Sequence, residues 1–150
     1  MKKAILISFI FCSVFSFGQT LYNPQDLYDS PGGLFDKDSL RDIYVNFQDP
    51  NYHNVLVNSF FTSPSSRIPA TITINGVSLD SAGVRYKGNS TFCLPNDNGN
   101  PKVPFNIDMN YWISGQKLLD YKKIKLANAW MDPTFAKEFT AAKIYRKYLP

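Results

Sequence analysis

The sequence predicts an α+β fold in which a mainly antiparallel, twisted sheet is packed against a C-terminal helix. Three observations favour this class. Apolar and polar residues alternate in several short segments, as they do in half-buried strands. The dipeptide Asn75-Gly76 separates two of these segments and is typical of a two-residue hairpin turn. From Asp132 onward, apolar residues recur at three- and four-residue steps, which indicates an amphipathic helix.

The first 18 residues have the composition of an export signal. Lys2 and Lys3 form a basic start, an apolar segment follows over residues 4–17, and small residues precede Gln19. This apolar segment of about 14 residues is shorter than the roughly 20 that a membrane-spanning helix needs. We therefore expect a signal peptide over residues 1–18, contact with a membrane only during export, and a secreted or cell-surface protein.

The composition does not indicate a nucleic-acid partner. The chain has 16 Lys and Arg against 12 Asp and Glu, a net charge of +4. Loss of Lys2 and Lys3 with the signal lowers this charge to +2, too little for a strongly basic surface. Cys93 is then the one cysteine left, which excludes an internal disulfide. With His53 as the only histidine, the sequence also has no Cys/His cluster for a metal.

The first elements follow an extended lead-in over residues 19–33, which is rich in Pro, Gly and Asp. We expect the domain itself to span residues 34–150. Residues 40–47 alternate in polarity and predict the first strand. An Asp-Pro pair then begins a segment with helical spacing, which predicts a short helix over residues 51–61 at an edge of the sheet.

The clearest strand signals surround the Asn-Gly turn. Residues 72–74 precede it, and residues 77–79 form the return strand. After the small residues 81–83, the alternation resumes at Val84 and Tyr86. This pattern predicts a twisted meander.

The C-terminal half is predicted to complete a sheet of about five strands. Residues 89–103, rich in Pro, Asn and Gly, predict a loop. Residues 105–109 and 123–126 alternate in polarity and predict two strands. A helix is then expected over residues 132–149, with Asp132 as its N-cap and a proline at its first position.

A candidate anion site lies in the stretch GVRYKGNSTF, residues 83–92. If the apolar residues of this strand face the core, Arg85 and Lys87 project together from its other side. The residues that follow, Gly88 to Thr91, predict a tight turn whose backbone N–H groups and hydroxyls suit a phosphate. Two basic residues are also an ordinary feature of a solvated strand face, so both interpretations stay open.

Three further residues have the order expected of a kinase small lobe. In phosphoryl-transfer enzymes a strand lysine that contacts nucleotide phosphates is often fixed by a helix glutamate. Lys102 follows the predicted loop, Lys125 lies on a predicted strand, and Glu138, the only glutamate in the chain, lies in the last helix. A lone helical glutamate is more often a solvated residue.

Taken together, these segments resemble the amino-terminal part of the CotH (spore coat protein H) kinase family. The matching stretches are GVRYKGNSTF, KVPFNIDMNYW and KKIKLANAWMDPTFAKEFTAAKIYRKYLP, which occur in this order between residues 34 and 150. The resemblance implies the small lobe of an atypical protein-kinase-like fold. It also implies ATP- and divalent-metal-dependent phosphorylation of serine in secreted or surface proteins.

The resemblance also assigns roles to residues. It implies that the nucleotide-side motif consists of Arg85, Lys87, Gly88 and Ser90, and it includes Lys102, Lys125 and Glu138 as weaker matches. The catalytic and metal-binding aspartates of the family lie in a second half that is not among these 150 residues. We therefore expect a fragment that binds nucleotide but does not catalyse alone, with apolar surface exposed near Trp112, Trp130 and Phe135.

The alternative is a non-catalytic secreted or cell-surface interaction module. Aromatic side chains are plentiful, and they serve either the core or the recognition of a protein or glycan. The residues concerned are Tyr44, Tyr52, Phe60, Phe61, Tyr111, Trp112 and Trp130.

Overall fold

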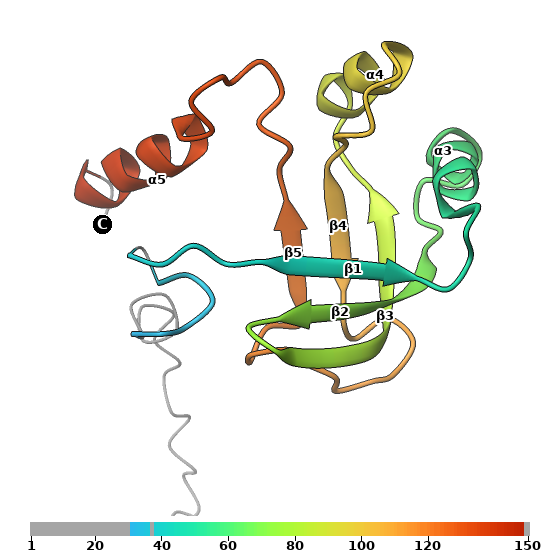
Figure 1. Cartoon of the computed structure of the whole chain (residues 1–150), viewed down its shortest axis with the longest axis horizontal. Helices are drawn as coiled ribbons and strands as arrows, with labels where there is room; N and C mark the ends of the chain where they lie inside the picture. Colours follow the sequence, from blue (N-terminus) through green and yellow to red (C-terminus); the bar gives the residue numbers. More distant parts are fainter. Residues whose placement is uncertain (1–30, 37, 149–150) are drawn as a thin grey trace, which may run out of the picture. The chain divides into compact units, whose positions relative to one another are not determined.

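A computed structural model of the chain describes residues 31–36 and 38–148 (Figure 1). The chain divides into two units, residues 1–39 and residues 40–150. The predicted signal peptide and most of the predicted lead-in lie outside the described residues. In the first unit, the Asp36 carboxylate accepts hydrogen bonds from the backbone N–H groups of Gly32 and Asp38. None of the described helices has the length and apolar character needed to cross a membrane.

The second unit contains an open five-stranded sheet with its strands in sequence order. Every pair of neighbouring strands is antiparallel, so the predicted α+β class and antiparallel sheet are confirmed. The strands are β1 (Ile43–Phe47), β2 (Ile68–Ile74), β3 (Val77–Tyr86), β4 (Phe105–Asp108) and β5 (Lys123–Leu126).

The β2–β3 hairpin turns at the predicted dipeptide. Asn75 and Gly76 have φ angles of 52° and 77°, and Ile74 pairs directly with Val77. Positive φ at both central residues is the backbone condition of a type I′ turn, which Asn-Gly adopts readily. The turn residues therefore set the register of the hairpin.

A β-bulge divides β3 into two parts of opposite alternation. Ile72 pairs with Leu79 but Ala70 pairs with Ala82, so Thr71 lies opposite two residues of β3. Ser81, at the bulge, has a φ of 60°. The sequence predicted a break over residues 81–83, whereas the structure has one continuous strand in which the bulge changes the residues that face inward.

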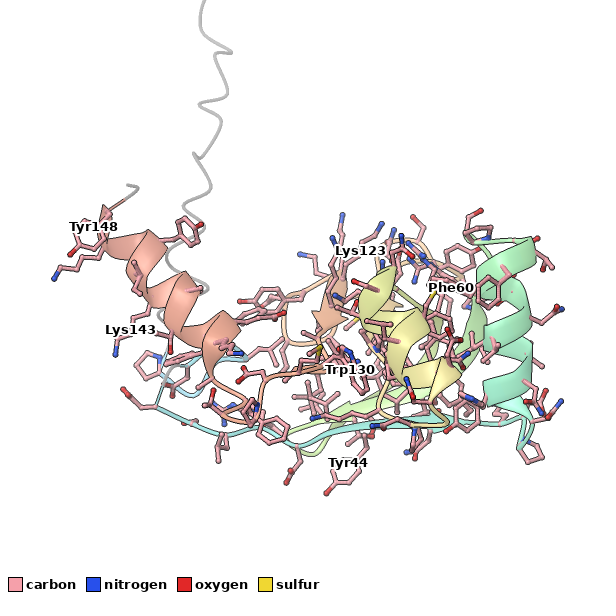
Figure 2. The ribbon with its side chains drawn as sticks, turned by 90° about the horizontal axis from the view of Figure 1, so that it is seen from above. Tyr44, Phe60, Lys123, Trp130, Lys143 and Tyr148 are labelled. Atoms are coloured by element: carbon pink, nitrogen blue, oxygen red, sulfur yellow. The ribbon has the colours of Figure 1, made fainter. Side chains whose placement is uncertain are left out.

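The sheet encloses the core between its two halves. In Figure 1, β1 and β2 run across β4 and β5, and β3 contributes to both halves. Tyr44 on β1 and Lys123 on β5 project from opposite sides of the body (Figure 2). The inward-facing strand residues between them are buried and include Ala70, Ile72, Ile74, Ala82, Val84, Ile107 and Ile124.

Helix α3 (Tyr52–Thr62) packs at one end of the central strand. It buries Leu56 against Tyr86, the last residue of β3, so the helix predicted over residues 51–61 is present. Next to this contact, the Tyr86 hydroxyl lies 2.7 Å from His53 Nδ1. Burial raises the pKa of the Tyr86 hydroxyl.

The predicted loop over residues 89–103 contains a second helix, α4 (Ser90–Asp97). Its Phe92 ring is fully buried, with its centroid 5.1 Å from that of Tyr86. Pro95 has no N–H to donate to the Thr91 carbonyl. The Asn128 side chain donates to that carbonyl instead, at 2.9 Å. Tertiary contacts thus stabilise a helix that the local composition disfavours.

The last helix begins later than predicted. Helix α5 spans Lys137–Tyr148, and Phe135 before it has a left-handed φ of 56°. Asp132 accepts hydrogen bonds from Thr134 and from the backbone N–H of Lys137, so it caps a turn that precedes the helix. All α5 side chains that the structure describes are exposed, and the predicted packing of this helix against the sheet is therefore not observed.

Candidate functional site

The second half of β3 has the alternation expected of the candidate motif. Val84 and Tyr86 are buried, whereas Arg85 and Lys87 are partly exposed. The bulge before residue 82 produces this arrangement, because it places even-numbered residues on the inner side. The two cations therefore lie on alternate positions of the chain, facing away from the core.

Strand pairing places Lys125 in the same row as Arg85. Arg85 pairs with Asn106 of β4, and Asn106 pairs with Lys125 of β5. Paired residues of neighbouring strands face the same side of a sheet, and with strands about 4.8 Å apart the two backbones are separated by about 10 Å. We define the outer face as the side that carries Gly83, Arg85, Asn106, Asp108, Lys123 and Lys125.

Arg67 also reaches the outer face, although no sequence pattern indicates this position. Its Nη1 donates to the carbonyls of Gly83 (3.0 Å) and Asn106 (2.9 Å), and its Nη2 donates to Asn106 Oδ1 (3.2 Å). Burial lowers the pKa of the Arg67 guanidinium, and the nearby charge of Arg85 lowers it further. Arg67 therefore connects β3 and β4 and adds a positive charge beside Arg85.

Arg85 has one edge of its guanidinium free for a ligand. Its Nη1 donates to the Pro64 carbonyl (3.0 Å) and the Tyr86 carbonyl (3.3 Å). No described residue accepts a hydrogen bond from its Nε or Nη2. These two groups form the side-on fork that binds phosphate or carboxylate through two parallel hydrogen bonds.

Only part of the positive charge of the outer face is balanced. Lys123 Nζ lies 3.0 Å from Asp108 Oδ2, in the one ion pair found among the described residues of this face. Asp108 Oδ1 also accepts the N–H of Asn110 at 3.1 Å. Arg67, Arg85 and Lys125 form no ion pair with a described residue, so the face as a whole attracts anions.

The predicted bend is open to solvent. Gly88, Asn89, Ser90 and Thr91 are all exposed, and Gly88 has a φ of 86° that a glycine adopts without strain. A Cβ at Gly88 would collide with the Thr91 hydroxyl. Ser90 is the first residue of α4, so this bend leads directly into the start of a helix.

Lys102 and Glu138 lie apart from the row that contains Arg85 and Lys125. The Lys102 carbonyl accepts from Asn128 Nδ2, the same group that contacts the Thr91 carbonyl, so the Lys102 backbone lies beside the bend. The Lys102 ammonium lies 3.9 Å from the centroid of the Phe135 ring. Glu138 is exposed in the first turn of α5 and forms no ion pair with any residue that the structure describes.

The acidic residues near the site have structural partners. Asp108 pairs with Lys123, as described above, and Asp132 accepts from Thr134 Oγ1 and from two backbone N–H groups. The hydrogen bond from the Thr134 hydroxyl is the main cause that lowers the pKa of Asp132. Over residues 31–36 and 38–148, no three or more His, Cys, Asp or Glu residues form a group suited to a metal.

The structure thus brings five of the seven predicted residues to one region. Arg85 and Lys125 share a row of the outer face, and Lys87, Gly88 and Ser90 continue the chain from β3 into the bend. Lys102 contributes its backbone next to the bend, and Glu138 lies on α5. Together these groups can bind an anion but supply no general base.

Comparison of the chain with protein-family models, with curated proteins and with solved structures finds no match.

Proposed function

We propose that this chain is the nucleotide-binding lobe of an exported CotH-like protein kinase. Its ligand would be ATP with a divalent metal, and the full enzyme would phosphorylate serine in secreted or surface proteins. The family assignment rests on the three sequence stretches described above. The observation that best supports a phosphate ligand is the free Nε–Nη2 edge of Arg85, in the same strand row as Lys125 and next to an exposed glycine bend.

The physical argument concerns charge and geometry. A guanidinium fork recognises two phosphate oxygens at once, and a lysine adds a point charge without directional demands. Arg85 and Lys125 lie on β3 and β5, on either side of β4, and the Arg67 guanidinium is held against β3 and β4 by hydrogen bonds, so the sheet positions all three cations. Such fixed donors can bind phosphates without a large rearrangement.

Binding alone does not transfer a phosphoryl group. The reaction also needs carboxylates that hold the metal and a residue that orients the acceptor hydroxyl. The described acidic residues of this region are engaged in the ion pair and the turn reported above. We therefore propose that the chain binds nucleotide and that residues outside it supply the catalytic groups.

The test is binding of a fluorescent ATP analogue to the purified chain. Arg85→Ala and Lys87→Ala should each weaken binding by about tenfold, because each removes a charge-assisted contact to phosphate. Lys117→Ala is the matched control, since Lys117 is an exposed lysine of the β4–β5 connection, at the opposite end of these strands. Equal affinity in wild type, Arg85→Ala and Lys87→Ala would refute the proposal.

A second candidate function is an interaction module, and the exposure of several aromatic residues favours it. Of the seven aromatic residues considered in the sequence, Tyr44, Phe61, Tyr111 and Trp112 are exposed. Exposed aromatic rings are frequent anchors in protein recognition. A nucleotide affinity that is unchanged in both Arg85→Ala and Lys87→Ala would favour this alternative.

A further inference from the structure

An aromatic pair lies beside the cations of the outer face. The Tyr111 side chain covers Gly83, because a Cβ at Gly83 would lie 2.7 Å from Tyr111 Cβ. Gly83 and Arg85 are two residues apart on β3, so they face the same side. Arg67 lies between them, with its Cζ 5.4 Å from the Tyr111 ring centroid and its Nη1 on the Gly83 carbonyl.

Trp112 extends this aromatic surface into solvent. Its ring meets the Tyr111 ring edge to face, with 4.7 Å between centroids and an interplanar angle of 89°. Tyr111 is 43% exposed and Trp112 is 52% exposed. Single exposed rings are common on protein surfaces. Two adjoining rings next to a row of cations are a more specific arrangement. The rings can stack on one part of a ligand while the cations bind its negative charge.

The order of these groups follows the strand. With a rise of about 3.3 Å per residue, Arg85 lies about 7 Å and Lys87 about 13 Å along the chain from Gly83, where Tyr111 packs. Along the outer side of β3, the groups therefore follow one another in the order aromatic pair, Arg67, Arg85 and Lys87. A nucleoside triphosphate has the same order of parts, with a planar base at one end and successive phosphates toward the other.

We propose that Tyr111 and Trp112 form the base-binding platform of the nucleotide site, with Trp112 stacking on the base. The phosphates run along the outer side of β3, past Arg67 and toward the free edge of Arg85 and the ammonium of Lys87. This inference rests on the proposed function, and it adds the part of the ligand that the cations cannot recognise. It predicts that the chain distinguishes a nucleotide from a bare polyphosphate.

The experiment compares ATP with inorganic tripolyphosphate on the same purified chain. Wild type should bind ATP about tenfold more tightly, as expected when one base stacks on an aromatic ring. Trp112→Ala should abolish this difference while leaving the affinity for tripolyphosphate unchanged, and Trp112→Phe should retain most of it. Tyr44→Ala is the control, because Tyr44 is also exposed but projects from the side of the body opposite Lys123 (Figure 2).

The outcomes separate this inference from the proposed function. If wild type binds both ligands equally, or if Trp112→Ala keeps the preference for ATP, the aromatic platform is refuted while the phosphate site stands. If Arg85→Ala changes the affinity for neither ATP nor tripolyphosphate, the phosphate site itself is refuted, and the aromatic platform with it. Circular dichroism of each variant verifies that the sheet is intact.

Discussion

At the scale of single residues, Asp132 shows how one carboxylate organises an irregular segment. Its Oδ1 accepts the N–H and the hydroxyl of Thr134 at 3.0 and 2.6 Å, and its Oδ2 accepts the N–H of Lys137 at 2.9 Å. All three hydrogen bonds favour the ionised form, which is why the pKa of Asp132 is lowered. The turn before α5 is therefore linked to the charge of this side chain.

This linkage predicts a defined pH dependence. Because the folded pKa of Asp132 lies below its ordinary value, the stabilising contribution of the carboxylate is complete above that ordinary value and is lost as the pH falls through the folded pKa. Thr134→Ala removes the largest cause of the shift and should move the pKa back toward its ordinary value. Carbon-13 NMR of the Asp132 carboxyl measures both titrations.

The control for this titration is Thr140→Ala. Thr140 is an exposed threonine of α5 with no contact to Asp132, so this substitution should leave the Asp132 titration where it is. An unchanged pKa in Thr134→Ala would show that the hydroxyl contributes nothing to the shift.

Arg67 illustrates a residue whose role the sequence could not reveal. It lies before β2, yet its guanidinium contacts β3 and β4, 16 and 39 residues away in the chain. Alternation of polarity reports which side a strand residue faces, but it carries no information about the reach of a long side chain across neighbouring strands. The buried amide of Asn106, 8% exposed, required such a partner, and the sequence did not show that Asn106 is buried.

At the scale of elements, α4 depends on contacts distant in the chain. Phe92 is fully buried, and the centroid of its ring lies 4.0 Å from that of Phe60 and 5.1 Å from that of Tyr86. A helix of eight residues has little stability of its own in water. The burial of its aromatic side therefore supplies most of what keeps it folded.

Truncation of this ring should be costly. Phe92→Ala is expected to lower the free energy of unfolding by about 3–5 kcal/mol, as other large-to-small substitutions of buried aromatic residues do. Leu94→Ala, which changes an exposed residue of the same helix, should change the free energy of unfolding by less than about 0.5 kcal/mol. Denaturant unfolding followed by circular dichroism compares the two, and similar losses would contradict the assigned burial.

The elements that the sequence predicted correctly are those with a local signal. Strand alternation located β1 to β5, and the Asn-Gly dipeptide located the hairpin turn. Helix α3 was predicted within one residue of each end. Helix α4 was missed because Asn128, 37 residues further along the chain, supports it. The start of α5 was missed because Phe135 is left-handed, a conformation that the apolar spacing does not report.

The candidate site was predictable to a similar extent. The positions of Arg85 and Lys87 on alternate residues followed from periodicity. The row that joins Arg85 to Lys125 depended on the β3–β4–β5 register, which the sequence does not specify. Glu138 forms no ion pair with a described lysine, since the order of elements along the chain does not determine where a helix lies.

At the scale of the whole molecule, the C-terminal region exposes many large apolar side chains. Of the three residues expected to lie in an exposed apolar region, Trp112 and Phe135 are exposed and Trp130 is partly buried. The other exposed apolar residues of this region are Met131, Phe139, Ile144, Tyr145 and Tyr148. The side chain of Tyr148 lies at the end of α5 in Figure 2.

Removal of α5 should therefore leave the sheet intact. A chain ending at Ala136 is expected to unfold within about 4 °C of the complete chain, because no described α5 side chain is buried and a loss of 1 kcal/mol would already shift the midpoint by that amount. Binding of a dye specific for exposed apolar surface should decrease. Thermal unfolding and dye fluorescence measure the two effects.

A control that keeps all 150 residues separates the effect of removing apolar surface from the effect of shortening the chain. Ile144→Ser together with Tyr145→Ser keeps the helix but removes two of its exposed apolar side chains, and it should lower dye fluorescence in the same direction. A large fall in the unfolding midpoint on truncation would instead show that α5 stabilises the sheet.

The bulge in β3 has a consequence for how this chain tolerates changes in length. The extra residue between Leu79 and Ala82 decides which side of the strand each later side chain occupies. Loss of one residue there would direct Arg85 inward and Tyr86 to the solvent, so that a cation would replace the aromatic ring that is now buried in the core. The spacing from the hairpin to the cations is therefore constrained more strictly than the identity of the residues that fill it.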